Sequence, residues 1–449
     1  MSGVARDSYR PILRLGVPMV LSSAVGMAAQ LAVTGLIGGI GDGALYVRSV
    51  YTPVAFLFLA VTTGLGVVLQ VVVAQAHGRG EREAVAPYLG SVARVGILAF
   101  VLLGLALALL GGPLADLMHT LPDRQDDFRR FLLAMTGTTL LGLLGELCSA
   151  TLRGLGRGGA AARVTVVYIA CYLGLIGLGA FVLDGGLMAV PAAGTVAALV
   201  EIGLGLWLLV RSGDVALAAL TGRRAEVPRL VGAIGVPVGA SYLVLFVTNL
   251  LLLRIVAPSG PDAVAGFNVG YTLQTAVVVP AVGFGSAVAI LMNQRLGAGD
   301  PAAAGRVHRH GLRIALGAYA VLTVVVLTAG GPLADLLSGD PHVAVHAREF
   351  LSVVGPTFGC TGVTLMVLTV LEQIGHGPLA ITLNAVYFTA VVVVAEVLVD
   401  GRQDLSRLYW TMAGAAVTGL VAGVPAVARL AARPRALRPA PEPAWEKQS

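Results

Sequence analysis

Twelve long apolar segments, separated by short stretches rich in Gly, Pro and charged residues, account for most of this 449-residue chain. Each segment is near or above the ~20 residues that an α-helix needs to cross a bilayer. The segments lie at 11–37, 51–76, 89–112, 129–152, 162–183, 188–210, 229–256, 263–292, 311–331, 347–371, 377–399 and 406–430. Backbone groups inside a membrane must bond within the protein, so each segment is expected to be a helix. The chain is therefore predicted to be an all-α polytopic membrane protein.

Composition narrows the class of function. Only 12% of the residues are charged, against about 25% in soluble domains, and the mean hydropathy is +0.86. The net charge of +6 lies in loops beside the membrane, so no nucleic-acid partner is expected. The sequence contains neither a P-loop nor a cluster of catalytic groups. We expect neither an enzyme nor a cofactor.

The distribution of Arg predicts an orientation. Most of the 30 Lys and Arg residues lie in loops on the side of the N-terminus. By the positive-inside rule, both termini are expected to be cytoplasmic. The large excess of Arg over Lys, with abundant Ala, Gly and Val, is typical of a high-GC bacterial genome. We therefore expect a multi-pass protein of the bacterial inner (plasma) membrane.

The heptapeptide GGPLADL occurs at Gly111–Leu117 and again 219 residues later, at Gly330–Leu336. The same offset aligns four further pairs: GVP at 16–18 with 235–237, GLG at 64–66 with GFG at 283–285, AQAHGRGE with NQRLGAGD, and LRGLGRG with LEQIGHG. The chain is thus predicted to be a duplicated six-helix unit. Because six is even, the two copies are parallel, and the paired glycines of GGPLADL are expected to end the third and ninth helices.

The repeat predicts two bundles and a tail. We expect an N-terminal six-helix bundle with its inner loop at 1–222 and a C-terminal six-helix bundle at 223–430. Residues 431–449 are rich in Pro and Arg and are expected to form a disordered cytoplasmic tail. Duplicated helical halves are typical of secondary transporters, in which the substrate site lies between the repeats.

Several phrases together resemble the MATE (multidrug and toxic compound extrusion) family. They are QRLGAGDPAAA at Gln294–Ala304, GVPMVLSS and GVPVGAS at the start of each half, DPHVAVHAREFL at Asp340–Leu351, and LRGLGRG. The resemblance covers about residues 11–430. It implies two six-helix bundles arranged as a V around a central cleft. It also implies an antiporter that exports amphipathic or cationic organic compounds in exchange for sodium ions or protons.

The chain departs from this family at the acidic coupling residues. Members of the sodium-coupled branch carry a glutamate and an aspartate at positions that correspond to Leu245 and Thr361 here. Another branch carries an aspartate near Val33 or Thr34. A sodium ion prefers charged oxygen ligands, so we expect protons to be the coupling ion.

Two glutamates inside predicted helices are candidates for carrying the proton. Glu201 lies in the middle of the sixth segment, where an ionisable group is costly and functional by default. The alternative is a protonated carboxyl bonded to a neighbouring helix. Glu146 could act as a gate or form a structural pair with Arg153, two turns along the same face. Glu372 lies near the end of a predicted helix, so we expect its carboxyl group to be solvated at the membrane interface.

Polar residues at helical spacing are candidates for lining a cavity. They are Asn268, Tyr271, Thr272 and Thr275 on the eighth segment, Ser241 and Asn249 on the seventh, Thr357 and Thr361 on the tenth, and Gln30 and Thr34 on the first. Such faces either bind helices to one another or line a cavity. Their convergence in the second half favours a cavity.

Two alternatives to efflux remain open. One is a flippase for lipid-linked or amphipathic precursors, against which twelve helices and the lack of Arg in mid-membrane argue. The other is a transporter fold with degenerate ion coupling, which the missing acidic residues allow. The expected partners are a small amphipathic or cationic substrate and the lipid bilayer, and we expect a monomer.

Overall fold

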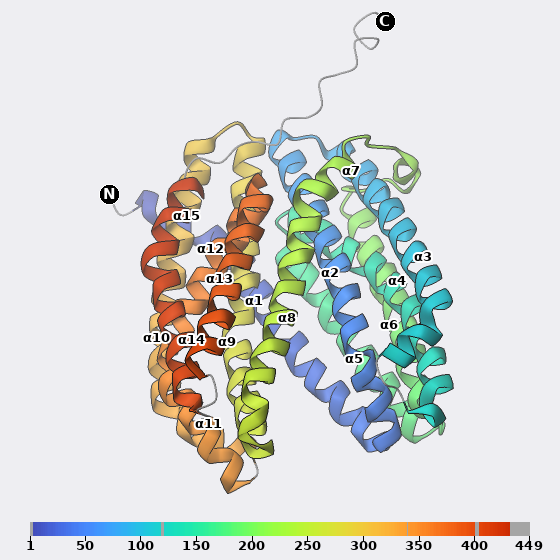
Figure 1. Cartoon of the computed structure of the whole chain (residues 1–449). Coiled ribbons are helices and arrows are strands. Elements are labelled where there is room, and N and C mark those ends of the chain that lie inside the picture. The colour runs from blue at the N-terminus through green and yellow to red at the C-terminus, as the bar shows by residue number, and fades with distance from the viewer. Residues whose placement is uncertain (1–2, 118–120, 339, 400–403, 432–449) are drawn as a thin grey trace, which may run out of the picture.

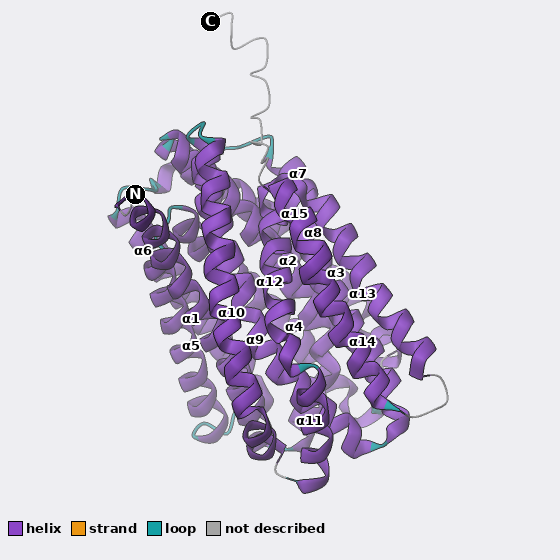
Figure 2. Cartoon of the chain, turned by 90° about the vertical axis from the view of Figure 1, so that its left-hand side faces the viewer, coloured by secondary structure: helices purple, strands orange, loops and turns teal. Residues whose placement is uncertain are grey.

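The computed structural model describes residues 3–117, 121–338, 340–399 and 404–431. Within these ranges the chain is helical apart from short connections, and no strand occurs in them (Figure 2). The prediction of an all-α chain is confirmed. The predicted tail, from residue 432 onwards, lies outside the described residues.

Long helices joined by short connections make up the first half. They are α1 (Gly3–Ile40), α2 (Asp42–Arg79), α3 (Val85–Leu117), α4 (Gln125–Gly154), α5 (Gly158–Phe181) and α6 (Ala189–Arg211). Each matches one of the apolar segments that the sequence marks, and none falls short of its segment by more than two residues. Several extend beyond the apolar segment, because a helix continues into the interface wherever its backbone bonds can still be made internally.

In the second half, three of the expected helices change their winding part of the way along. They are α7 (Val227–Leu230) with α8 (Val236–Val256), α11 (Pro341–Val353) with α12 (Phe358–Leu371), and α14 (Leu405–Thr418) with α15 (Val424–Ala431). The others are α9 (Pro261–Gly297), α10 (Pro301–Ser338) and α13 (Gly377–Val399). All twelve expected helices are therefore present in the described residues.

By length and composition, ten stretches of the described helices are able to cross a membrane. One of these stretches, Gly355–Val399, contains both α12 and α13. The two helices are joined by the π-helical turn Glu372–His376, inside which Ile374 and Gly375 leave the helical conformation. Gly375 has φ of 92°, a value that glycine adopts without steric cost, so the chain can change direction there.

The expectation that the glycines of GGPLADL end helices is wrong. α3 continues through Pro113 to Leu117, and α10 continues through Pro332 to Ser338. A proline removes one backbone hydrogen bond, but the groups beyond it still find their best partners in the next helical turn. The repeated phrase therefore marks equivalent helix ends one to two turns later than expected.

The packing of the helices repeats in the two halves. α1, the first helix of its half, packs against α5 of the same half and against α9 of the other half. α8 packs against α13 of its own half and against α2 of the other. Each half therefore reaches across to the second long helix of its partner, as expected for two parallel copies. Figure 1 shows the two bundles diverging toward the end at which α11 lies.

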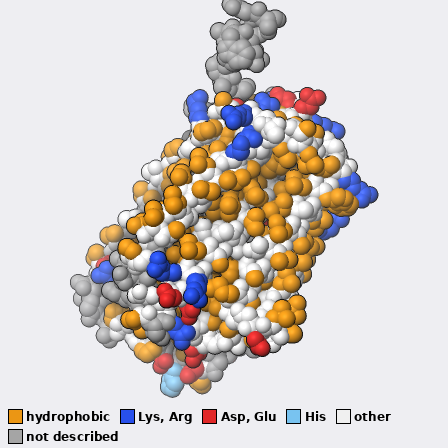
Figure 3. All heavy atoms as spheres, turned by 90° about the vertical axis from the view of Figure 1, so that its right-hand side faces the viewer, with side chains coloured by type: hydrophobic (Ala, Val, Ile, Leu, Met, Phe, Trp, Pro, Cys, Tyr) orange, Lys and Arg blue, Asp and Glu red, His pale blue; other side chains and the backbone are white. Residues whose placement is uncertain are grey.

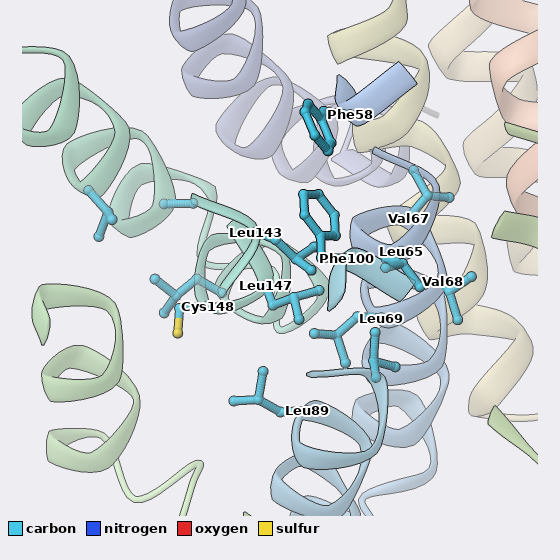
Figure 4. Packing of buried hydrophobic residues seen from close by; sticks show 14 of the residues in the cluster. Phe58, Leu65, Val67, Val68, Leu69, Leu89, Phe100, Leu143, Leu147 and Cys148 are labelled. Carbon is cyan, nitrogen blue, oxygen red and sulfur yellow. The ribbon is translucent and has the colours of Figure 1, made fainter. Parts of the chain in front are cut away.

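Apolar side chains fill the bundle of the first half (Figure 4). Phe58 of α2 stacks on Phe100 of α3 with ring centroids 5.3 Å apart, and Leu143 and Leu147 of α4 are fully buried in the same cluster. On the face shown in Figure 3, hydrophobic side chains cover the middle, and charged side chains gather toward the two ends. That distribution is expected where lipid surrounds a helical bundle.

The two halves meet closely near the ends of α2 and α9. Gln75 Nε2 donates a hydrogen bond to Asn293 Oδ1 at 2.8 Å across the contact. Gly297 packs on the backbone of Gln75, and Gly78 packs on the backbone of Gln294, so the contact repeats with the two halves exchanged. We call this contact, formed by 75–78 and 293–297, the seam.

The close packing at the seam predicts that adding a single methyl group lowers the stability of the protein. Gly297→Ala would place a Cβ against the carbonyl oxygen of Gln75, so the two helices would have to separate. We expect a loss of about 1–3 kcal/mol of stability, typical of overpacking, and a lower melting temperature in detergent. Gly317→Ala in α10 is the control, because a methyl group there meets no neighbouring atom. Equal melting temperatures for the two variants would contradict the prediction.

Candidate functional site

A cavity of about 810 Å³ lies between the two halves. Helices α1, α2, α4 and α5 form its wall on one side, and α8, α9, α12, α13 and α14 form the other. Gln70 and Ser286 belong to the wall, and the seam begins five to seven residues further along the same helices. The seam therefore closes one end of the cavity, about 10 Å beyond these residues.

The wall in the second half contains most of the polar residues picked out from the sequence. Its members include Ser241 and Asn249 of α8, Asn268, Tyr271, Thr272 and Thr275 of α9, and Thr361 of α12. Thr275 Oγ1 and Thr361 Oγ1 donate to backbone carbonyls one turn earlier in their own helices. These hydroxyls are satisfied locally, and their side chains still contribute to the surface of the cavity.

Four candidates lie outside the cavity wall altogether. Thr357 is buried in the turn before α12 and donates to the carbonyl of Val354 at 2.8 Å. Gln30 and Thr34 lie on an exposed part of α1, and Thr34 Oγ1 donates to the carbonyl of Gln30 at 3.0 Å. Glu201 is the fourth and is buried inside the first half.

Glu201 of α6 faces α4. Its side chain is 7% exposed, and Ser149 Oγ donates to its Oε1 at 3.4 Å. Gly145 leaves room for the carboxyl, because a Cβ at that position would lie 2.6 Å from Glu201 Oε2. Gly145 and Ser149 flank Glu146 and Cys148 on α4, so Glu201 lies directly behind the part of α4 that carries the cavity residue Glu146.

Glu146 forms an ion pair with Arg153, and both residues line the cavity. Arg153 Nε also donates to Gln70 Oε1 at 3.0 Å. Gln70 Nε2 then donates to Gln373 Oε1 at 3.1 Å, and Gln373 Nε2 donates to Ser286 Oγ at 2.7 Å. This polar chain, Glu146–Arg153–Gln70–Gln373–Ser286, crosses from the first half to the second at the closed end of the cavity.

Glu372 was expected at a solvated interface, and the structure corrects this. Its side chain is 8% exposed, lines the cavity, and accepts a hydrogen bond from Ser241 Oγ at 2.6 Å. The π-helical turn that begins at Glu372 keeps the carboxyl within the wall. The internal repeat contained a signal that could have identified Glu372 as a wall residue, because the 219-residue offset aligns it with Arg153.

Asn384 of α13 was also missed. It lines the cavity and is 3% exposed, yet its Oδ1 has no hydrogen-bond partner among the described residues. Aromatic rings complete the wall: Phe56 stacks on Phe246 with centroids 4.4 Å apart, and Tyr387 meets Phe388 edge to face at 5.1 Å. The cavity thus combines aromatic surface with a few polar groups, as binding sites for small organic molecules do.

Leu245 and Thr361 both line the cavity. By the resemblance to the family, these are the positions at which members of its sodium-coupled branch carry the coupling carboxylates. Within the described ranges there is no group of three or more His, Cys, Asp or Glu residues that could hold a metal ion. The wall at these two positions offers one hydroxyl and an alkyl side chain, a poor set of ligands for a hard cation.

Two parallel six-helix repeats around a central cavity are an architecture found among membrane transporters. The MatE family model matches residues 18–176 and 237–398, which is most of both halves, and the chain belongs to this family of membrane transporters. The match in two segments also agrees with the internal duplication.

Similar proteins include a probable multidrug resistance protein NorM from Deinococcus radiodurans, 30% identical over 334 residues that cover 71% of each chain. Another NorM, from Bradyrhizobium diazoefficiens, is 25% identical over 377 residues covering 78% of each chain. Among solved structures, the bent form of the Vibrio cholerae MATE transporter VcmN superposes with a TM-score of 0.86 at 20% identity. The match covers 95% of this chain and 98% of that one. At this identity the structural likeness shows the fold alone.

The Glu146–Arg153 pair predicts a specific pattern of stability. Arg153→Leu leaves a half-buried carboxylate without its cation and should cost about 1–3 kcal/mol, whereas the double variant Glu146→Leu/Arg153→Leu should recover most of the loss. Arg348→Leu breaks an exposed pair with Asp335 and should have little effect. Melting temperatures in detergent test this pattern, and a double variant no more stable than Arg153→Leu would refute it.

Proposed function

We propose that the chain is a secondary-active antiporter that exports amphipathic or cationic organic compounds, including drugs and toxins. The observation that carries the proposal is the cavity of about 810 Å³ between the halves, lined by aromatic rings, amides and carboxyl groups. Its size is in the range that encloses drug-sized ligands. The similar proteins described as multidrug resistance proteins support the same function.

Transport is proposed to occur by alternating access. The two moving bodies are the bundles at 1–222 and 223–430, and the seam is the contact that must separate when the opposite end of the cavity closes. The packing between the halves supports this division. α1 of the first half packs against α9 of the second, and α8 of the second half packs against α2 of the first in the equivalent way. Rigid-body rocking of two repeats about a central site is the usual mechanism of such folds.

Protons are the proposed coupling ion, and Glu201 and Glu146 are the proposed carriers. Glu146 lines the cavity, and Glu201 is packed against the same stretch of α4. A carboxyl group at membrane depth is costly to keep and is functional by default. The neutral side chains at Leu245 and Thr361 support protons over sodium ions.

The proposed setting is the bacterial inner membrane, with both termini in the cytoplasm and the protein as a monomer. The excess of Arg in the loops on the side of the N-terminus supports this orientation. No cofactor is part of the proposed mechanism. A flippase for anionic lipid-linked precursors is less well supported, because Arg153, the basic residue of the described cavity wall, is already paired with Glu146.

Dye transport in liposomes tests the function. With purified protein and an imposed pH gradient, wild type should move ethidium, and Glu201→Gln and Glu146→Gln should each lower the rate at least tenfold. Glu349→Gln is the matched control, since this carboxylate on α11 has a side chain that is 41% exposed and lies outside the cavity wall. Rates equal to wild type in both Glu201→Gln and Glu146→Gln would remove these glutamates from the coupling mechanism. No movement of dye in wild type would refute the antiporter itself.

A sodium gradient without a pH gradient should not drive dye movement. The reason is that neither Leu245 nor Thr361 can supply the charged oxygen that a sodium site needs. The measurement uses the same liposomes, with choline replacing sodium on one side and identical pH on both. Sodium-driven flux comparable to proton-driven flux would contradict the choice of coupling ion.

A further inference from the structure

Among the described residues, three charged side chains line the cavity: Glu146, Arg153 and Glu372. Glu146 and Arg153 neutralise each other in an ion pair. Glu372 has no basic partner among the described residues, and its hydrogen bond comes from the neutral hydroxyl of Ser241 at 2.6 Å. When Glu372 is ionised, the cavity therefore carries one uncompensated negative charge at its closed end.

The position of Glu372 leaves part of its carboxyl group available. Ser241 bonds to Oε1, and Oε2 accepts no hydrogen bond from the described residues. The residue begins the π-helical turn that follows α12, and Ser241 on α8 donates a hydrogen bond to it from across the wall. The 219-residue offset aligns Glu372 with Arg153 of the first half. Equivalent positions therefore carry opposite charges, and of these two residues Arg153 has an ion-pair partner within the described residues.

Asn384 gives a second and independent indication of a ligand. Its side chain is 97% buried from solvent, lines the cavity, and leaves Oδ1 without a partner among the described residues. A buried amide oxygen without a hydrogen bond is costly, unless a ligand supplies the donor. Asn384 lies seven residues into α13, about 10 Å along the helix from its start at Gly377. Tyr387 and Phe388 continue the wall from there.

We propose that Glu372 is the charge anchor for a monovalent organic cation, and that Asn384 accepts a hydrogen bond from an N–H group elsewhere on the same molecule. The cation faces Oε2 of Glu372 at the closed end, and the aromatic body of the ligand lies along Tyr387 and Phe388. The preferred cargo is thus a monovalent aromatic cation that carries amino groups. This inference rests on the proposed function, since it takes the cavity as the site that binds the cargo.

Two probes separate the two contacts. Ethidium is a monovalent aromatic cation with two amino groups, and tetraphenylphosphonium is a monovalent aromatic cation with no N–H donor. Equilibrium binding to the full-length protein in detergent is measured for both. Glu372→Gln should weaken both probes about tenfold or more, because each loses a charge partner. Asn384→Leu should weaken ethidium about three- to tenfold and leave tetraphenylphosphonium nearly unchanged.

Glu349→Gln is the control variant, because it makes the same change at an exposed carboxylate that lies outside the cavity wall. It should bind both probes as wild type does. If Glu372→Gln does not fold, wild type alone still tests the anchor: triphenylphosphine oxide, a neutral aromatic compound, should bind at least tenfold more weakly than tetraphenylphosphonium.

Unchanged affinity for both cations in Glu372→Gln would overturn the inference, as would equal binding of the neutral compound to wild type. A wild-type protein that binds neither cation would overturn it too. Equal losses for the two probes in Asn384→Leu would remove Asn384 from the site. Because binding needs no gradient, Glu372-dependent binding without dye transport would refute the proposed antiporter and leave this inference standing.

Discussion

The polar chain Glu146–Arg153–Gln70–Gln373–Ser286 is the contact on which the arrangement of the two halves depends. Inside a membrane, helices gain little from burying apolar surface against each other, so hydrogen bonds and close packing decide which faces meet. This chain crosses between the halves, and beside it Gln75 and Asn293 bond across the seam. Glycines at the seam let the backbones approach closely enough for these bonds to form. The cavity exists because this contact closes only one end.

The duplication explains both the symmetry of the fold and the asymmetry of the cavity. α1 and α8 pack in equivalent ways, each on the second long helix of the other half. The side chains at equivalent positions differ: Arg153 is neutralised by Glu146, whereas the partner of Glu372 within the described part of the chain is the hydroxyl of Ser241. Two copies of the same helical arrangement can therefore enclose a cavity that carries a single net charge when Glu372 is ionised. A cavity of this kind discriminates by charge without needing a separate domain for recognition.

Much of the fold could be predicted because its main constraint is local. Apolar length marks every helix, and the constant offset marks the repeat and its direction. The four wall residues of α9, Asn268, Tyr271, Thr272 and Thr275, share a helical face, which periodicity also reveals. Glu372 was misplaced because nearness to a helix end in the sequence does not say whether the end is solvated. The π-helical turn that starts at Glu372 keeps its carboxyl group in the cavity wall, and no periodic pattern in the sequence predicts such a turn. Thr357 was selected for the same reason as Thr361, but it lies in the turn before α12, donates to the carbonyl of Val354, and is not part of the cavity wall.

The sequence by itself determined that the chain is a helical membrane protein with two parallel repeats, and the MatE family to which it belongs. These follow from hydrophobic length, from backbone hydrogen bonds that must be satisfied inside each helix, and from motifs in a fixed order. The tertiary structure alone decided which ionisable groups meet. It paired Glu146 with Arg153, placed Glu201 behind α4, and left Glu372 and Asn384 in the wall of the cavity. The reason is that partners in a polar network come from helices far apart in the chain, and only their packing brings them within bonding distance.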